Sequence, residues 1–303
     1  MKYQFISDHQ HCYAVEEMCE AFALSPGSYY RWKTRSPSAR SLEDAQVKEH
    51  IMRIYDQAKG RYGYRAIYHH LKDEGIDCGR DRTLRLMNEM SIAGIQKQRF
   101  KPLGTDSNHR FGYSANLLKQ TGDPAGLDQV WVADTTYLFT NQGWCYLATV
   151  MDLYSRRIIG WSISSSNNTE LVSQALRAAV LCRGKLPEGT IHHSDRGSTY
   201  ASHSYQRLLR SFSMESSMSA KGNCYDNAAM ESFYGRYKNS SVRGHIFADE
   251  SELRSNVFEY IEVFYNRFRK HSSLGYKTPV QIEQKICPHG GNPASLSACI
   301  NNN

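Results

Sequence analysis

Three apolar runs rich in β-branched and aromatic residues follow one another near the middle of the 303-residue chain. They cover residues 130–139, 144–153 and 157–164. Short runs of this kind, separated by Gly143 and by the Ser155-Arg156 step, are typical of neighbouring strands. Helical and strand-like patterns then alternate, at 169–183, 190–194, 200–211, 213–217 and 250–268. We expect Thr169 to cap the first of these helices. The order predicts an α/β fold with a mixed sheet that begins with a meander.

Helical periodicity dominates the N-terminal third of the chain. Two short helices fit residues 14–33, on either side of the turn Ser25-Pro26-Gly27. They predict either a helix-turn-helix or a plain helical hairpin whose aromatic residues form a core. Further helices are expected at 41–58, 65–74 and 80–91. The last one carries three arginines beside an apolar face, which suits either the major groove of DNA or a solvated basic surface.

These patterns divide the chain into five segments. We expect a helix-turn-helix-like module at 1–40, a second helical DNA-binding module at 41–98, a basic linker at 99–127, the α/β core at 128–286 and a disordered tail at 287–303. The linker is polar, and its lysines and arginines could follow a phosphate backbone.

The charge balance favours a polyanionic partner. Lys and Arg number 37 and Asp and Glu 30, which gives a net charge of +7. The sequence has no apolar run long enough for a membrane span and no basic-then-apolar leader at its start, so we place the protein in the cytoplasm. It also lacks a Gly-rich loop ending in Gly-Lys-Ser/Thr, which excludes a P-loop ATPase motor.

Three acidic residues stand in settings that suit metal ligands: Asp134, Asp195 and Glu231. Asp134 shares one strand face with the apolar Val130 and Val132, and a buried carboxylate needs a metal or a cation beside it. Asp152, in the next apolar run, is a rival strand acid, although it could instead pair with Arg156 or Arg157 nearby.

Asp195 and Glu231 each have a functional and an ordinary interpretation. Asp195 follows a short apolar run, where open α/β sheets present ligand-binding groups, but it could be a turn aspartate before Arg-Gly. Glu231 shares a helical stripe with Lys238, which suits either a metal ligand beside a phosphate-binding lysine or an exposed surface pair. Together the three acids could hold two magnesium ions against a phosphodiester.

Two other chemistries fit parts of the sequence. A loose group of possible zinc ligands lies near the start of the chain, at His9, His11, Cys12 and Cys19. Reduced thiols are the simpler interpretation of these cysteines. His193 and Arg196 match the His-x-x-Arg pair of tyrosine recombinases, but that pair belongs on a helix of an all-helical domain, and here strand-like runs surround it.

Several long motifs, in order along the chain, point to one family. They are WVADTTYL (131–138), HSDRGSTYAS (193–202), KGNCYDNAAMESFYGRYK (221–238) and YNRFRKHSSLGYKTP (265–279). With them the sequence closely resembles bacterial insertion-sequence transposases of the subgroup whose integrase-like catalytic half is encoded by a second, frameshifted reading frame. The resemblance covers nearly the whole chain.

The resemblance implies an RNase H-like core with a catalytic triad of two aspartates and a glutamate. Carried over, the triad is Asp134, Asp195 and Glu231, with Asp134 preferred over Asp152. It implies two Mg²⁺ ions, with Mn²⁺ as a substitute, and cleavage at transposon ends followed by strand transfer from the freed 3′-OH through a circular intermediate. The expected partners are double-stranded DNA at the transposon ends and the target, a second copy of the chain or a higher oligomer, and the upstream-frame protein.

Basic residues near these motifs are the candidates for DNA contact. They are Lys238, Lys221, Arg196, Arg267, Arg269, Lys270, His271, Arg61, Arg65, Arg80, Arg82 and Arg85. Two other functions remain open for the same sequence. One is a DNA-binding regulator with an inactive integrase-like core, and the other is a structure-selective nuclease.

Overall fold

A five-stranded mixed sheet forms the centre of the C-terminal half in the computed structural model, which describes residues 1–95, 113–184, 186–219 and 227–286. The strands are β1 (Val130–Thr140), β2 (Gly143–Asp152), β3 (Ile158–Ser164), β4 (Ile191–Ser194) and β5 (Glu215–Met218). Their order is β3-β2-β1-β4-β5. The first three pair antiparallel as a meander, and β1, β4 and β5 pair parallel, which confirms the predicted mixed sheet.

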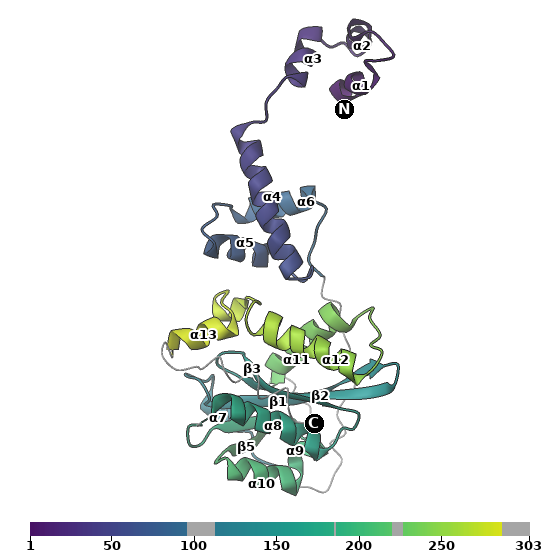
Figure 1. Ribbon diagram of the computed structural model, residues 1–303. Coiled ribbons are helices and arrows are strands. Elements are labelled where there is room, and N and C mark those ends of the chain that lie inside the picture. Colours follow the sequence, from purple (N-terminus) through teal and green to yellow (C-terminus); the bar gives the residue numbers. More distant parts are fainter. Residues whose placement is uncertain (96–112, 185, 220–226, 287–303) are drawn as a thin grey trace.

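Helices on one face of the sheet bury its first apolar layer (Figure 1). They are α8 (Thr169–Arg183), α9 (Ser198–Ala201) and α10 (His203–Ser211). Gly160 of β3 lies so close to α8 that a Cβ there would stand 2.3 Å from the carbonyl oxygen of Ala175. The predicted cap of α8 was wrong by one residue. Asn168, in extended conformation, accepts the amide of Leu171 and is the N-cap, so Thr169 is the first helical residue.

The opposite face is covered by helices from the end of the chain. They are α11 (Ala228–Tyr237), the π-helical η2 (Lys238–Val242), α12 (Glu250–Phe258), the π-helical η3 (Glu259–Tyr265), the short 3-10 turn η4 (Ser272–Leu274) and α13 (Pro279–Ile286). The pattern at 250–268 predicts one long helix. In the structure, the first part is the α-helix α12 and the second part is the π-helix η3. Just after η3, the Asn266 side chain pairs with both the amide and the carbonyl of Ile158 on β3. This side chain ties the π-helix to the sheet edge.

The N-terminal helices form two separate bundles. The first contains α1 (Lys2–His9), α2 (Val15–Ala21) and α3 (Pro26–Lys33), around a small core of Ile6, Met18, Cys19 and Tyr29. The second contains α4 (Ala39–Gln57), α5 (Tyr64–Asp73) and α6 (Arg80–Glu89). A single turn of helix, α7 (Leu118–Thr121), precedes β1. Helix α1 has no counterpart in the sequence predictions. None of the described helices is long and apolar enough to cross a membrane.

The second bundle packs on the C-terminal helices of the core (Figure 1). Arg61 forms a double hydrogen bond with Glu259 of η3, at 2.9 and 3.2 Å, and its side chain is only 5% exposed. Lys270 is equally enclosed and pairs with Asp73 of α5. The Tyr62 hydroxyl donates to the carbonyl of Phe268. We call these three contacts the module–core latch. Arg61 and Lys270 are therefore poor candidates for DNA contact, because both side chains are enclosed and each is already paired with an acid of this chain.

Candidate active site

Strand pairing places Asp134 and Asp195 next to each other. β1 and β4 pair in parallel, and the last residues that pair are Val132 and His193. Asp134 and Asp195 each lie two residues further along the chain. Asp134 is inside β1, opposite Thr149 of β2, and Asp195 directly follows β4. The pairing of β1 with β4 thus ends two residues before each of the two acids, which are far apart in the sequence.

Helix α11 brings Glu231 to the same region. Tyr234, three residues after Glu231, points its hydroxyl at the sheet and donates to the carbonyl oxygen of Asp134 at 2.7 Å. The same hydroxyl lies 2.8 Å from the Thr149 hydroxyl and 3.1 Å from the carbonyl oxygen of Leu147. Glu231 itself is exposed, one turn before this buried anchor. The helix is therefore fixed against β1 and β2 at the position of Asp134.

The three acids share one electrostatic environment. Burial, the largest cause, and repulsion from the Asp195 carboxylate raise the pKa of Asp134 to about 8. The charge of Glu231 acts in the same direction, while the amide of Thr135 and the ammonium of Lys238 oppose the shift. The Thr135 amide donates to the Asp134 carboxylate at 2.8 Å. Asp134 is thus a carboxyl whose ionisation is opposed by both other acids.

This donor set fits a hard divalent cation. Carboxylate oxygens are the ligands that Mg²⁺ prefers, and a cation would relieve the repulsion that raises the pKa of Asp134. Within the described ranges, no three Asp, Glu, His or Cys side chains lie together in an arrangement that could already hold a metal ion. The acids that would hold the ion are Asp134, Asp195 and Glu231.

Neighbouring groups hold Asp195 and its strand in place. The Asp195 carboxylate accepts the amide of Gly197 at 2.9 Å, and a Cβ at Gly197 would stand only 2.9 Å from that same oxygen. His193 is fully buried and bonds through its two ring nitrogens to the hydroxyls of Ser217 and Ser219. This histidine therefore joins β4 to β5 and the residues after it from inside the protein.

Asp152, the rival strand acid, has a structural role. It is fully buried and accepts the amides of Asp128 and Ser155, each at 2.7 Å. Its cationic neighbour is Arg183, at 3.9 Å, rather than the arginines near it in the sequence. With its oxygens engaged by the backbone, Asp152 holds the turn after β2.

Two of the predicted phosphate-binding residues lie near the acids. Lys238, at the end of α11, has its ammonium 4.4 Å from the centre of the Tyr137 ring on β1. Arg196 donates to the carbonyl of Ser219 at 2.8 Å and lies over the ring of Tyr113. Lys221, the third, is outside the described residues. Both described side chains are held by aromatic rings beside the acidic site.

The remaining basic candidates differ in their surroundings. Arg82 and Arg85 share Asp44 of α4 as an ion-pair partner, at 2.7 and 2.8 Å. Burial lowers the pKa of His271 to about 3, so this side chain is neutral and a poor phosphate ligand. Arg269 is partly buried and Arg267 is exposed. Exposed arginines also stand at the start of α5 and of α6, at Arg65 and Arg80.

Sequence reasoning missed the residues that support the acids. They are Tyr234, whose hydroxyl reaches the carbonyl of Asp134, and Tyr200, whose hydroxyl lies 3.1 Å from that of Thr135. A tyrosine in an apolar stripe beside a functional acid is a usable signal, because a buried hydroxyl needs a partner.

Comparisons with known proteins agree with this architecture. Family models described as "Integrase core domain" match residues 125–224 and 213–279, and one described as "HTH-like domain" matches residues 41–100. The chain is 41% identical over 268 residues to the Insertion element IS600 uncharacterized 31 kDa protein of Shigella sonnei, covering 88% of this chain and 98% of that one. It is 36% identical over 289 residues to the transposase InsF for insertion sequence IS3A of Escherichia coli (strain K12), covering 94% and 99%.

A similarity to solved structures is weaker. The catalytic core domain of BIV integrase covers 54% of this chain and 99% of its own length, at 15% identity and a TM-score of 0.40. The strand order and the integrase-core matches together confirm the predicted fold class, an RNase H-like mixed-sheet core preceded by helix-turn-helix-like helices. Because of its identity to these relatives over nearly their whole length, the chain belongs to the family of insertion-sequence transposases with an integrase core domain.

Proposed function

We propose that this transposase cleaves DNA at the ends of its element in a Mg²⁺-dependent reaction and then joins the freed 3′-OH to DNA. Two observations support the reaction: the pairing of β1 with β4 runs toward Asp134 and Asp195, and the charges of Asp195 and Glu231 both act on the Asp134 carboxyl. Asp134, Asp195 and Glu231 are the proposed catalytic and metal-binding residues, with two Mg²⁺ ions and Mn²⁺ as a substitute.

Each acid has a distinct task in this proposal. Asp134 and Asp195, adjacent in the sheet, would hold the cations between them, and Glu231 would bind from the helix side. When bound, the cations supply the charge that stabilises the phosphodiester transition state and that acidifies an attacking water. The amides of Thr135 and Gly197 donate to the carboxylates of Asp134 and Asp195, and the Tyr234 hydroxyl donates to the backbone carbonyl of Asp134.

The chemistry has two balanced displacements. Water attacks a phosphodiester at the element end, which leaves a 3′-OH on one side and a 5′-phosphate on the other. The 3′-OH then attacks a second phosphodiester, so one P–O bond forms as another breaks. We propose that the first joining is to the other end of the same element, which gives a circular intermediate. Lys238 and Arg196 would hold the phosphates; their contacts with the rings of Tyr137 and Tyr113 support this role.

The required partners follow from this chemistry. Two element ends must be brought together, so we propose that a dimer or larger assembly of this chain acts on double-stranded DNA, with the upstream-frame protein as a further partner. The reaction would take place in the cytoplasm, where bacterial DNA lies.

A substitution in the proposed triad tests the reaction. The full chain is incubated with Mg²⁺ and a plasmid carrying the element ends, and nicked and joined products are separated. Asp195→Asn is expected to lower cleavage by about 10³-fold, since metal-based charge stabilisation supplies several kcal/mol. Its binding to the same DNA should persist. The matched control is Glu215→Gln, an exposed acid on the adjacent strand β5, which should cleave normally.

The products separate this proposal from its alternatives. A DNA-binding regulator would give no metal-dependent cleavage in the parent chain, and a structure-selective nuclease would give nicks without joined strands. Unchanged cleavage in Asp195→Asn would remove the triad from the mechanism.

A further inference from the structure

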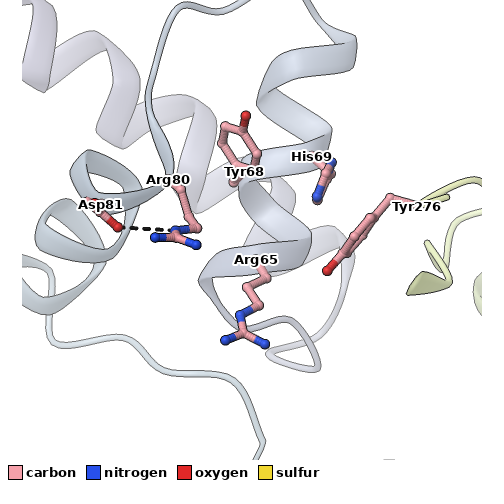
Figure 2. Close-up of a pocket in the computed structure, with 6 residues that line it drawn as sticks. All are labelled: Arg65, Tyr68, His69, Arg80, Asp81 and Tyr276. Carbon is pink, nitrogen blue, oxygen red and sulfur yellow. Dashed lines mark hydrogen bonds and ion pairs between the residues drawn. The ribbon is translucent and has the colours of Figure 1, made fainter. Parts of the chain in front are cut away.

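A polar cavity lies where the second helical bundle meets the C-terminal helices of the core. Figure 2 shows its walls, and its volume is about 510 Å³. It is lined by Arg65, Tyr68 and His69 of α5, Arg80 and Asp81 of α6, and Tyr276 from the loop after η4. Two parts of the chain, about two hundred residues apart in sequence, thus contribute to one cavity.

The cavity carries a net positive charge. Arg65 and Arg80 are both exposed at the cavity wall. The single acid, Asp81, pairs with Arg80 at 3.2 Å, but the Asp81 side chain is 86% exposed, so this pair contributes little. Contact with the Tyr64 hydroxyl, and then proximity to Tyr276, raises the pKa of Arg65 further. Helix α6 begins at Arg80. The first amides of this helix have no intrahelical acceptor and therefore favour a nearby anion.

The core contributes an aromatic wall that is held under backbone strain. The His69 ring stacks on the Tyr276 ring, with centroids 3.5 Å apart and an interplanar angle of 17°. Tyr276 has a φ of +60°, a left-handed conformation that is unusual for a tyrosine. Its amide donates to the carbonyl of His271 at 2.8 Å, which holds this conformation. Strain of this kind is often retained where a side chain must be placed for binding.

The module–core latch fixes the two walls relative to each other. The Arg61–Glu259 pair and the Lys270–Asp73 pair join the same two parts of the chain that line the cavity. The Tyr62 hydroxyl adds a hydrogen bond across the same junction. The positions of the residues that line the cavity are therefore fixed by ion pairs and a hydrogen bond between the second helical bundle and the core.

We propose that this cavity binds a backbone phosphate of double-stranded DNA, held jointly by the HTH-like module and the integrase core. Two guanidinium groups supply the charge that a phosphate needs, and Tyr68 and His69 line the same cavity. Because Tyr276 belongs to the core, a phosphate here fixes the DNA on the helical module relative to the acidic site. This inference rests on the proposed function, since it concerns how the same DNA is held.

The salt dependence of DNA binding tests the site without cleavage. The full chain carrying Asp195→Asn, here the parent, is titrated into a labelled duplex over a series of salt concentrations, and anisotropy gives the affinity. Arg65→Gln/Arg80→Gln should lower the magnitude of the slope of log affinity against log salt by about 0.9, the value for one lost phosphate contact. Both side chains are exposed, so the melting temperature should not change. The matched control is Arg210→Gln, at the exposed end of α10 on the far side of the sheet (Figure 1), and it should keep the parent slope.

A second variant tests the contribution of the core. Tyr276→Asn removes the ring but suits a left-handed backbone, because asparagine tolerates that conformation. It removes no charge, so the slope should stay the same while the affinity falls by about fivefold, because the His69 ring loses the aromatic ring on which it stacks at the cavity. An unchanged affinity in this variant would overturn the joint site.

The possible failures are distinguishable. If the parent does not bind the duplex at all, the proposed function itself fails. If the parent binds and the double arginine variant keeps its slope, only this inference fails. If the cavity binds free phosphate instead of DNA, the melting temperature of the parent should rise when inorganic phosphate replaces chloride at constant ionic strength. The double arginine variant should then keep the slope of the parent. This pair of results would also overturn the inference.

Discussion

The module–core latch makes a quantitative prediction about the Arg61–Glu259 ion pair. Arg61 has a side chain that is only 5% exposed, and Glu259 is 26% exposed. The guanidinium also bonds to the Ser241 hydroxyl at 3.1 Å and lies 4.6 Å from the centre of the Phe264 ring. Removing Glu259 leaves the buried Arg61 guanidinium uncompensated, so Glu259→Ala should lower the free energy of unfolding by about 3–5 kcal/mol. Arg61→Ala should cost less, because Glu259 keeps its ion pair with Lys59 at 3.3 Å.

A double-mutant cycle isolates the pair itself. Urea unfolding followed by circular dichroism gives the free energy of unfolding of the parent, the two single variants and the double variant. We expect a coupling energy of about 2 kcal/mol for Arg61 with Glu259, since directly bonded buried groups couple by about 0.5–3 kcal/mol. The exposed pair Arg53–Glu74, at 2.5 Å, is the matched control and should couple by less than about 1 kcal/mol. Equal coupling energies for the two pairs would refute the argument that burial gives the latch its strength.

Two further predictions concern the sheet. Gly160→Ala should lower the free energy of unfolding, measured by urea unfolding, by about 1–3 kcal/mol. The reason is that the new Cβ would stand 2.3 Å from the carbonyl oxygen of Ala175 on α8. An unchanged midpoint would contradict this close approach. The second prediction concerns pH. Because the pKa of Asp134 is raised to about 8, above the unfolded value of about 3.9, the folded chain binds the extra proton between these values. In metal-free buffer the melting temperature should therefore fall as the pH rises from about 4 to about 8, and Asp134→Asn should flatten this slope. A variant with the slope of the parent would show that Asp134 is not the group responsible.

The strands could be predicted from sequence because their cause is local. β-branched and aromatic runs bounded by turn residues mark β1, β2 and β3 to within one residue at most ends. The π-helix at 259–265 could not be predicted, because the helical periodicity continues through it and the contact that follows it, between Asn266 and the backbone of Ile158, joins residues far apart in the sequence. Helix α1 was missed because its residues show little helical amphipathicity.

The DNA-contact residues were harder to predict because charge in a sequence does not reveal its partner. Arg61 and Lys270 looked like surface cations, but their acids lie almost two hundred positions away, at Glu259 and Asp73. The ion-pair partner of Asp152 was hard to predict for the same reason, since it is Arg183 rather than the nearby Arg156 or Arg157. The acids Asp134, Asp195 and Glu231 were found through motifs, and the register of the sheet explains how the first two come together.

Direct measurement of Mg²⁺ binding tests the central claim that these three acids act as one site. Isothermal titration of Mg²⁺ into the complex of the full chain with duplex DNA should show two ions per chain. Asp134→Asn, Asp195→Asn and Glu231→Gln should each weaken binding by more than about tenfold, since loss of even a supporting partner costs that much. Glu215→Gln should leave the titration unchanged. Parent-like Mg²⁺ binding in all three triad variants would contradict the account.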